Sequence, residues 1–201
     1  GILTVGLGAV ASTLIAGVEL VKRGLAAPTG SLSQMGTIRV DGVSTPIRDI
    51  VPIAALDDVV FGAWDPFPDD AYVAATRAGV LEGGKHIEQI SDALREVRPM
   101  AAAFDREYVK RIDAPNHLQT IDKRSMLEAI RADIHRFREE KQCDRLVMIW
   151  CASTEIFIEP GPAHQTLEAF EAAITANDPT IAPSMLYAYA ALLEGVPFAN
   201  R

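Results

Sequence analysis

The sequence predicts an α/β domain with a doubly wound, mainly parallel β-sheet and flanking helices. Three observations carry this prediction. Strand-like apolar segments alternate along the chain with segments of helical periodicity. The predicted strand at residues 145–150 is apolar on both faces from Leu146 onward, as a strand buried inside a parallel sheet requires. A glycine-rich turn at residues 6–8 separates the first strand from the first helix.

Each predicted element follows from local periodicity and from the residue that ends it. The strongest helix, over residues 123–141, has one apolar stripe and charged residues elsewhere. Asp41-Gly42 predicts the tight turn of a small hairpin, and Pro66 ends a strand because proline cannot continue the ladder. The predicted elements in chain order are strands over residues 2–6, 37–40, 59–64 and 145–150, and helices over residues 9–23, 69–81, 87–97, 123–141, 163–176 and 183–194.

Composition and charge exclude several classes of function. The 201 residues are 49% hydrophobic and 23% charged, which is typical of a globular chain with one core. The longest apolar run covers residues 185–193, whereas a membrane-spanning helix needs about 20 apolar residues. The formal net charge is −8, and each basic stretch is balanced by neighbouring acids. We therefore expect no membrane and no nucleic-acid partner.

Cysteines and histidines indicate neither a disulfide nor a metal site. Cys143 and Cys151 flank one predicted strand and are too far apart along it to form a bridge, which favours a reducing, cytoplasmic compartment. The four histidines are scattered, without the i, i+4 spacing of a helical metal site. Cys151 could be a nucleophile, but a cysteine at the end of a buried strand is usually an inert small hydrophobe.

The turn after the first strand has the pattern G-x-G-x-x-A, from Gly6 through Gly8 to Ala11. Gly6 permits a tight turn, Gly8 lets backbone N–H groups approach a pyrophosphate, and Ala11 allows close packing of helix on strand. This context predicts dinucleotide binding, with a ligand-free β–α turn as the alternative. The acid expected about 20 residues further on, for the ribose hydroxyls, has no clear candidate near Ser31.

Polar residues follow two other predicted strands. Asp65 comes directly after the strand at residues 59–64, at the edge where open α/β sheets bind ligands. Its alternative role is that of a turn residue before Pro66. The strand at residues 145–150 leads into the segment 151–155, whose hydroxyl groups could equally cap a helix or turn. Arg111 could reach a phosphate or lie on the surface.

Together, these segments resemble the myo-inositol-phosphate synthase family. The resemblance extends along the whole chain and is carried by residues 5–8, 30–34, 61–65, 146–155, 181–184 and 194–198. It implies a Rossmann-like domain that binds NAD. The positions that match the family's cofactor-binding residues are Gly8, Ala9, Val10 and Ala11 in the pyrophosphate turn, Asp65, Arg111, and Cys151, Ala152, Ser153 and Thr154 after the third strand.

The chain departs from the family pattern at two motifs. Many members have Gly-Asn-Asn where this chain has Ala9-Val10-Ala11, so that backbone donors must replace side-chain amides. The family's Thr-Ala-Asn-Thr is replaced by Cys-Ala-Ser-Thr at residues 151–154. No arginine stands directly after the expected ribose-binding position, and this favours NAD over NADP.

The resemblance also implies a reaction. Members convert glucose 6-phosphate to inositol phosphate by internal oxidation at C5 with NAD, aldol cyclisation and reduction, and they assemble as homotetramers. Residues 1–201 would be the N-terminal NAD-binding domain, without the inserted domain that carries the catalytic lysines. We therefore expect no catalytic residue in this chain and no activity from it alone. The alternatives are another NAD(P)-dependent oxidoreductase and a non-catalytic nucleotide-binding module.

Overall fold

A four-stranded parallel sheet forms the centre of the computed structural model, which describes residues 1–81 and 85–200. β1 (Ile2–Val5) lies between β4 (Phe61–Trp64) and β5 (Val147–Trp150), and β6 (Phe198–Asn200) pairs with the outer side of β5. The strand order β4-β1-β5-β6 confirms the predicted parallel α/β sheet. No sequence pattern predicts β6.

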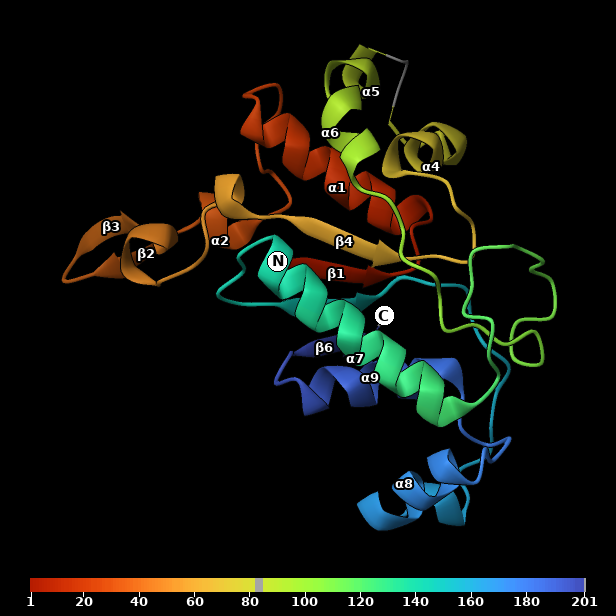
Figure 1. The fold of residues 1–201 in the computed structure, drawn as a ribbon. Coiled ribbons are helices and arrows are strands. Elements are labelled where there is room, and N and C mark those ends of the chain that lie inside the picture. Colours follow the sequence, from red (N-terminus) through yellow and green to blue (C-terminus); the bar gives the residue numbers. More distant parts are fainter. Residues whose placement is uncertain (82–84, 201) are drawn as a thin grey trace.

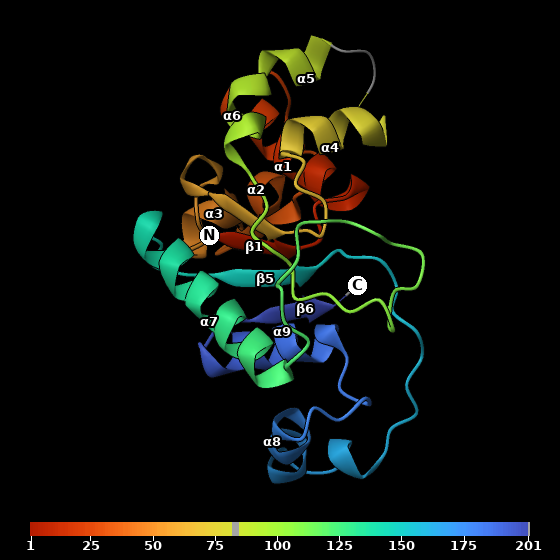
Figure 2. The same cartoon turned by 45° about the vertical axis from the view of Figure 1, so that its right-hand side comes forward.

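Helices cover both faces of this sheet (Figure 1). One face is covered by the helices that follow β1 and β4, and the other by two helices on either side of β5 in the sequence. The turned view in Figure 2 shows the same three layers, with α8 outside them. The helices of the first face are α1 (Ala9–Lys22), α4 (Ala71–Ala78), α5 (Lys85–Gln89) and α6 (Ser91–Glu96); those of the second are α7 (Lys123–Glu140) and α9 (Pro183–Leu193), and α8 spans Leu167–Thr175.

The predicted hairpin is present and extends away from the sheet (Figure 1). It consists of β2 (Thr37–Val40) and β3 (Val43–Pro46), which pair antiparallel. Asp41 and Gly42 have φ values of 50° and 83°, as the two central residues of a type I′ turn require. Short helices adjoin the hairpin and the strand β4: α2 (Leu32–Met35), α3 (Ile47–Ile50) and the 3-10 turn η1 (Leu56–Asp58).

The hydrophobic core lies on both faces of β1. Leu3 and Val5 pack into the cluster beneath α7 and α9, and Ile2 contacts the cluster beneath α1 and α4. The apolar stripe predicted for the helix at residues 123–141 is buried, with Ile134 fully inaccessible to solvent. In the described residues, no helix is both long and apolar enough to span a membrane.

Two predicted helices are each divided in the structure. Residues 87–97 form α5 and α6, because Ile90 leaves the helical region (φ −122°, ψ 14°) while its side chain is fully buried. Residues 163–176 form the 3-10 turn η2 (Pro162–His164) and then α8. The division occurs at Thr166, whose Oγ1 accepts a hydrogen bond from the Ala169 N–H at 3.1 Å and thereby caps a new helix.

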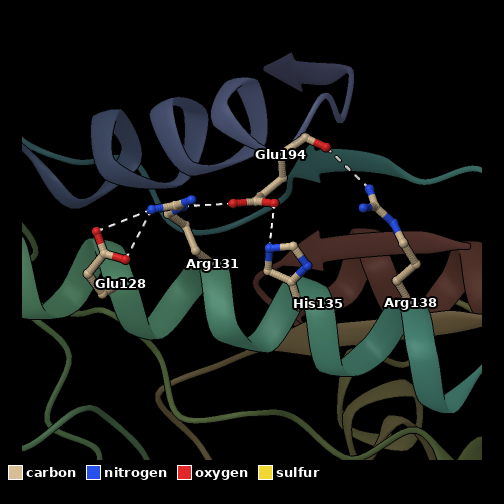
Figure 3. A network of polar contacts seen from close by, with 5 residues as sticks. All are labelled: Glu128, Arg131, His135, Arg138 and Glu194. Carbon is tan, nitrogen blue, oxygen red and sulfur yellow. Dashed lines mark hydrogen bonds and ion pairs between the residues drawn. The ribbon is translucent and has the colours of Figure 1, made fainter.

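A polar network joins the middle of α7 to the end of α9 (Figure 3). The Glu194 side chain is only 7% exposed, and its carboxylate accepts from Arg131 Nε at 2.7 Å and contacts His135 Nε2 at 2.6 Å. Arg138 donates to the backbone carbonyl of Glu194. The alternating charges of this helix predict a salt-bridged, solvated face. The structure confirms ion pairs within α7, but two side chains of this face, Arg131 and His135, contact the buried Glu194 carboxylate instead of facing solvent alone.

Candidate functional site

A cavity of about 300 Å³ lies at the carboxyl ends of β1, β4 and β5. The chain passes from β1 outward to β4 and later returns to begin β5 on the opposite side of β1. Such a reversal of strand order leaves a crevice at the sheet edge, where open α/β sheets bind ligands. Residues from the turn after β1, from the ends of β4 and β5, from α4 and from the segment 102–112 line the cavity.

The glycine turn after β1 forms one wall. Gly6 has φ +95°, and a Cβ atom there would lie 2.6 Å from the Ala152 Cα, so this position requires glycine. Gly8 also lines the cavity, and a Cβ there would meet no atom within 4 Å. Gly8 is the N-cap of α1 and provides no side-chain cap, so the first N–H groups of the helix lack intrahelical acceptors. This wall therefore offers backbone donors and a positive helix end to an anion.

Asp65 connects the end of β4 to that turn. Its Oδ2 accepts from the Leu7 N–H at 2.6 Å, and its Oδ1 accepts from the Phe67 N–H at 2.9 Å. Burial raises the pKa of this carboxyl group above its usual value, although the two backbone hydrogen bonds act in the opposite direction. Asp65 is thus both a turn residue and a cavity residue, which combines the two roles that the sequence left open.

The end of β5 forms the opposite wall. The Cys151 N–H donates to the Val5 carbonyl at 2.8 Å, and Cys151, Ala152 and Ser153 line the cavity. Glu155 follows them and accepts hydrogen bonds from the N–H and the hydroxyl of Ser184 at the start of α9. Burial raises the pKa of the Glu155 carboxyl group.

An apolar wall closes the third side of the cavity. It includes Phe104, Val109 and Ile112. Tyr108 fixes this segment, since its hydroxyl donates to the Pro179 carbonyl at 2.6 Å and its own carbonyl accepts from the Ile156 N–H at 3.0 Å. These contacts tie the segment to both sides of α8.

The structure brings six of the ten predicted site residues to the cavity: Gly8, Ala9, Asp65, Cys151, Ala152 and Ser153. The other four lie elsewhere. Val10 is 41% exposed, Ala11 is buried in the core beneath α1, and Arg111 is exposed. Thr154 lines a neighbouring polar cavity of about 480 Å³ together with Glu155, Ser184 and Asn200.

Arg77 is a cavity residue that no sequence motif indicates. It lies in the last turn of α4, twelve positions after Asp65, and is the one basic residue among the described cavity-lining residues. The predicted helix at residues 69–81 already placed it after the correct strand. So short an amphipathic segment does not, however, indicate which side of the helix faces the cavity.

This fold and this cavity define a dinucleotide-binding α/β domain. The family model described as myo-inositol-1-phosphate synthase, an NAD-binding model, matches residues 1–201, and the chain belongs to this family. The family resemblance inferred from the sequence is thereby confirmed.

Curated relatives and a crystal structure agree with this assignment. An inositol-3-phosphate synthase of Bacteroides thetaiotaomicron is 43% identical over 201 residues, covering 98% of this chain and 47% of the relative. Inositol-3-phosphate synthase isozyme 1 of Arabidopsis thaliana is 31% identical, and the match covers 100% of this chain and 43% of the relative. The crystal structure of the Caenorhabditis elegans synthase matches with a TM-score of 0.86 at 26% identity, over 98% of this chain and 43% of that one. The chain therefore spans about half the length of the curated relatives it matches.

Proposed function

We propose that residues 1–201 form the NAD-binding domain of an enzyme that converts glucose 6-phosphate to 1D-myo-inositol 3-phosphate. The observation that carries the proposal is the family match over the whole chain. The cavity of about 300 Å³ at the carboxyl ends of β1, β4 and β5, next to the glycine turn, supports it. The relatives named above are inositol-3-phosphate synthases.

The cavity residues fit a dinucleotide. The open space above Gly8 and the uncapped start of α1 suit a pyrophosphate, because backbone N–H groups can approach it without a side chain between. Each Asp65 oxygen accepts one backbone N–H and keeps a lone pair that could accept from a ribose hydroxyl. Of the family-matched residues, Cys151, Ala152 and Ser153 would hold the cofactor from the β5 side. Val10, Ala11, Arg111 and Thr154 match the family motifs from outside this cavity, and we propose them as cofactor-binding residues on that match alone.

The chain's contribution to the reaction would be binding, orientation and exclusion of water. When bound, NAD supplies a hydride acceptor and donor for the oxidation and later reduction of the sugar carbon. The wall formed by Phe104, Val109 and Ile112 would shield this exchange from solvent. We assign no catalytic residue to this chain. Proton transfer and binding of the sugar's phosphate group would fall to parts of the enzyme outside residues 1–201. We further propose a homotetramer in the cytoplasm, as the family resemblance implies.

Calorimetric titration of the 201-residue chain with NAD+ tests the cofactor part of this proposal. We expect saturable binding by the chain, and weaker binding by Gly8→Leu, whose side chain would fill the space above the turn. Gly17→Leu is the matched control, because a Cβ at Gly17 also meets no atom within 4 Å and Gly17 is not a cavity residue. Equal NAD+ affinity in Gly8→Leu and Gly17→Leu would contradict the proposed site.

A chimera tests the reaction. Residues 1–201 would replace the matching segment of the B. thetaiotaomicron synthase, which is 43% identical to them. The chimera is expected to form inositol phosphate from glucose 6-phosphate without net NADH, and the isolated chain to form none. Net NADH accumulation by a folded chimera would instead indicate another oxidoreductase.

A further inference from the structure

Helix α4 brings one arginine to the edge of the cavity beside the glycine turn. Arg77 lines the cavity beside Ala74 and Ala78, and its Nη2 donates to Asp69 Oδ2 at 2.6 Å. The Arg77 side chain is 63% exposed and that of Asp69 is 30% exposed. Asp69 lies in the connection between β4 and α4, four residues after Asp65, and also lines the cavity. The arginine therefore stands over the same strand end as the proposed ribose-binding acid.

The charges around this cavity are unbalanced. Its described lining contains three carboxylates, those of Asp65, Asp69 and Glu155, and one cation, Arg77. The fields of Asp69 and Arg77 both reach Asp65: Asp69 raises the pKa of the Asp65 carboxyl group and Arg77 lowers it. All three groups line the same cavity, and Arg77 and Asp69 are in direct contact there.

The residue types at the end of β4 bear on the choice between NAD and NADP. An acid after the second strand of such a domain accepts the ribose 2′-hydroxyl of NAD, whereas an arginine near the same point accommodates the 2′-phosphate of NADP. Both residue types are present here. The outcome depends on whether the guanidinium is available to the phosphate, and the ion pair with Asp69 engages it.

We propose that Asp69 makes the cavity selective for NAD over NADP by pairing with the Arg77 guanidinium, so that this charge is not available to a 2′-phosphate, and by adding a second negative charge to the same wall as Asp65. This inference rests on the proposed NAD site. Asp69 acts here as a positioning residue: its carboxylate determines where the Arg77 side chain lies. Because exposed ion pairs add little stability, removing this one should leave the domain folded.

Titrations with NAD+ and with NADP+ test the proposal on the wild-type chain and its variants. In Asp69→Asn the preference for NAD+ over NADP+ is expected to fall about tenfold, equivalent to about 1.4 kcal/mol. In the double variant Asp69→Asn/Arg77→Met the gain in NADP+ affinity should disappear, because the freed cation is absent. Asp69→Glu keeps a carboxylate at this position and should retain the wild-type preference for NAD+. A purely structural effect of position 69 would not predict this result.

Asp92→Asn is the matched control. Asp92 forms a similar ion pair with Arg23 at 2.7 Å, and it does not line the cavity, so its variant should keep the wild-type preference. An Asp69→Asn preference equal to that of Asp92→Asn would overturn the inference, and so would a gain in NADP+ affinity that survives Arg77→Met. If the wild-type chain binds neither nucleotide, both the proposed NAD site and the role of Asp69 are contradicted. If the wild-type chain binds NAD+ but Asp69→Asn keeps its preference for NAD+ over NADP+, only the role of Asp69 is contradicted.

Discussion

Asp65 and Glu155 occupy similar places beyond the carboxyl ends of β4 and β5, but their carboxylates have different partners. Asp65 accepts from two backbone N–H groups, those of Leu7 and Phe67. Glu155 accepts from one residue, Ser184, through its backbone N–H and its hydroxyl. Both carboxyl groups are largely desolvated, and burial raises the pKa of each.

The difference assigns the two acids different structural tasks. Asp65 fixes the path of the turn that follows β1, so the proposed pyrophosphate wall depends on it. Glu155 fixes the start of α9 against the segment after β5. Gly6 links the ends of β4 and β5. The N–H of the following residue, Leu7, donates to Asp65, and Gly6 packs directly against the backbone of Ala152. A substitution at Gly6 should therefore affect both strand ends, whereas a substitution of Asp65 or Glu155 should affect only one.

Gly6→Ala is expected to have the largest effect. The new Cβ would lie 2.6 Å from the Ala152 Cα and would stand on a residue with φ +95°, so backbone must move at the centre of the cavity. We expect a loss of about 3 kcal/mol or more in the free energy of unfolding, with loss of NAD+ binding. Denaturant unfolding and calorimetric titration measure the two quantities.

Gly24→Ala separates the two causes of that loss. Gly24 also has a positive φ, +67°, but a Cβ there meets no atom within 4 Å. Its variant should lose only about 1 kcal/mol through backbone strain. If both alanine variants lose the same free energy, contact between Gly6 and Ala152 does not join the two strand ends.

Asp65→Ala is expected to have the next largest effect. It removes the acceptor of the Leu7 and Phe67 N–H groups, and an unsatisfied, partly buried donor costs about 1–3 kcal/mol. NAD+ affinity should fall by about tenfold or more, because the turn and a ribose acceptor are lost together. Asp65→Asn, which keeps one acceptor oxygen, should lose less on both measures. An Asp65→Ala chain with wild-type NAD+ affinity would contradict the role given to this strand end.

Ser184→Ala tests the other end and should have a smaller effect. Only the hydroxyl donor to Glu155 is removed, while the Ser184 N–H still donates at 3.1 Å. We expect a loss of about 1 kcal/mol in the free energy of unfolding. Because Ser184 does not line the cavity beside the glycine turn, NAD+ affinity should change far less than in Asp65→Ala. A comparable fall in affinity would show that the two ends are not separable.

The two ends also differ in how far the sequence predicts them. The glycine turn, α1 and the position of Asp65 follow from local patterns, since their residues are neighbours in the chain or follow a recognisable strand. The partner of Glu155 lies 29 residues away, and periodicity carries no information on such a pairing. The strand β6 was missed for a related reason: its three residues are too few for an alternating pattern, and pairing with β5 determines them as a strand.

The same distinction applies within the candidate site. The family pattern named whole motifs, including Val10 and Ala11, but the helix that begins at Ala9 turns Ala11 into the core and leaves Val10 exposed outside the cavity. Arg77 belongs to no motif. Only the packing of α4 against α1 brings it to the cavity, together with Asp69, and such packing depends on tertiary contacts.

The smallest expected effect is a shared pH dependence of the two acids. A carboxyl group whose pKa is raised in the folded state binds more protons there than in the unfolded chain, so its contribution to stability falls as pH rises. The fall begins near the ordinary values of 3.8 for Asp65 and 4.5 for Glu155 and ends above the raised folded values. Asp65→Asn and Glu155→Gln remove this loss, and each variant should become more stable relative to wild type as pH increases from about 4 to 7. Denaturant unfolding across that range measures the difference. If the gain occurs in Glu155→Gln alone, the backbone hydrogen bonds of Asp65 outweigh its burial, and the two strand ends differ in electrostatics as well as in partners.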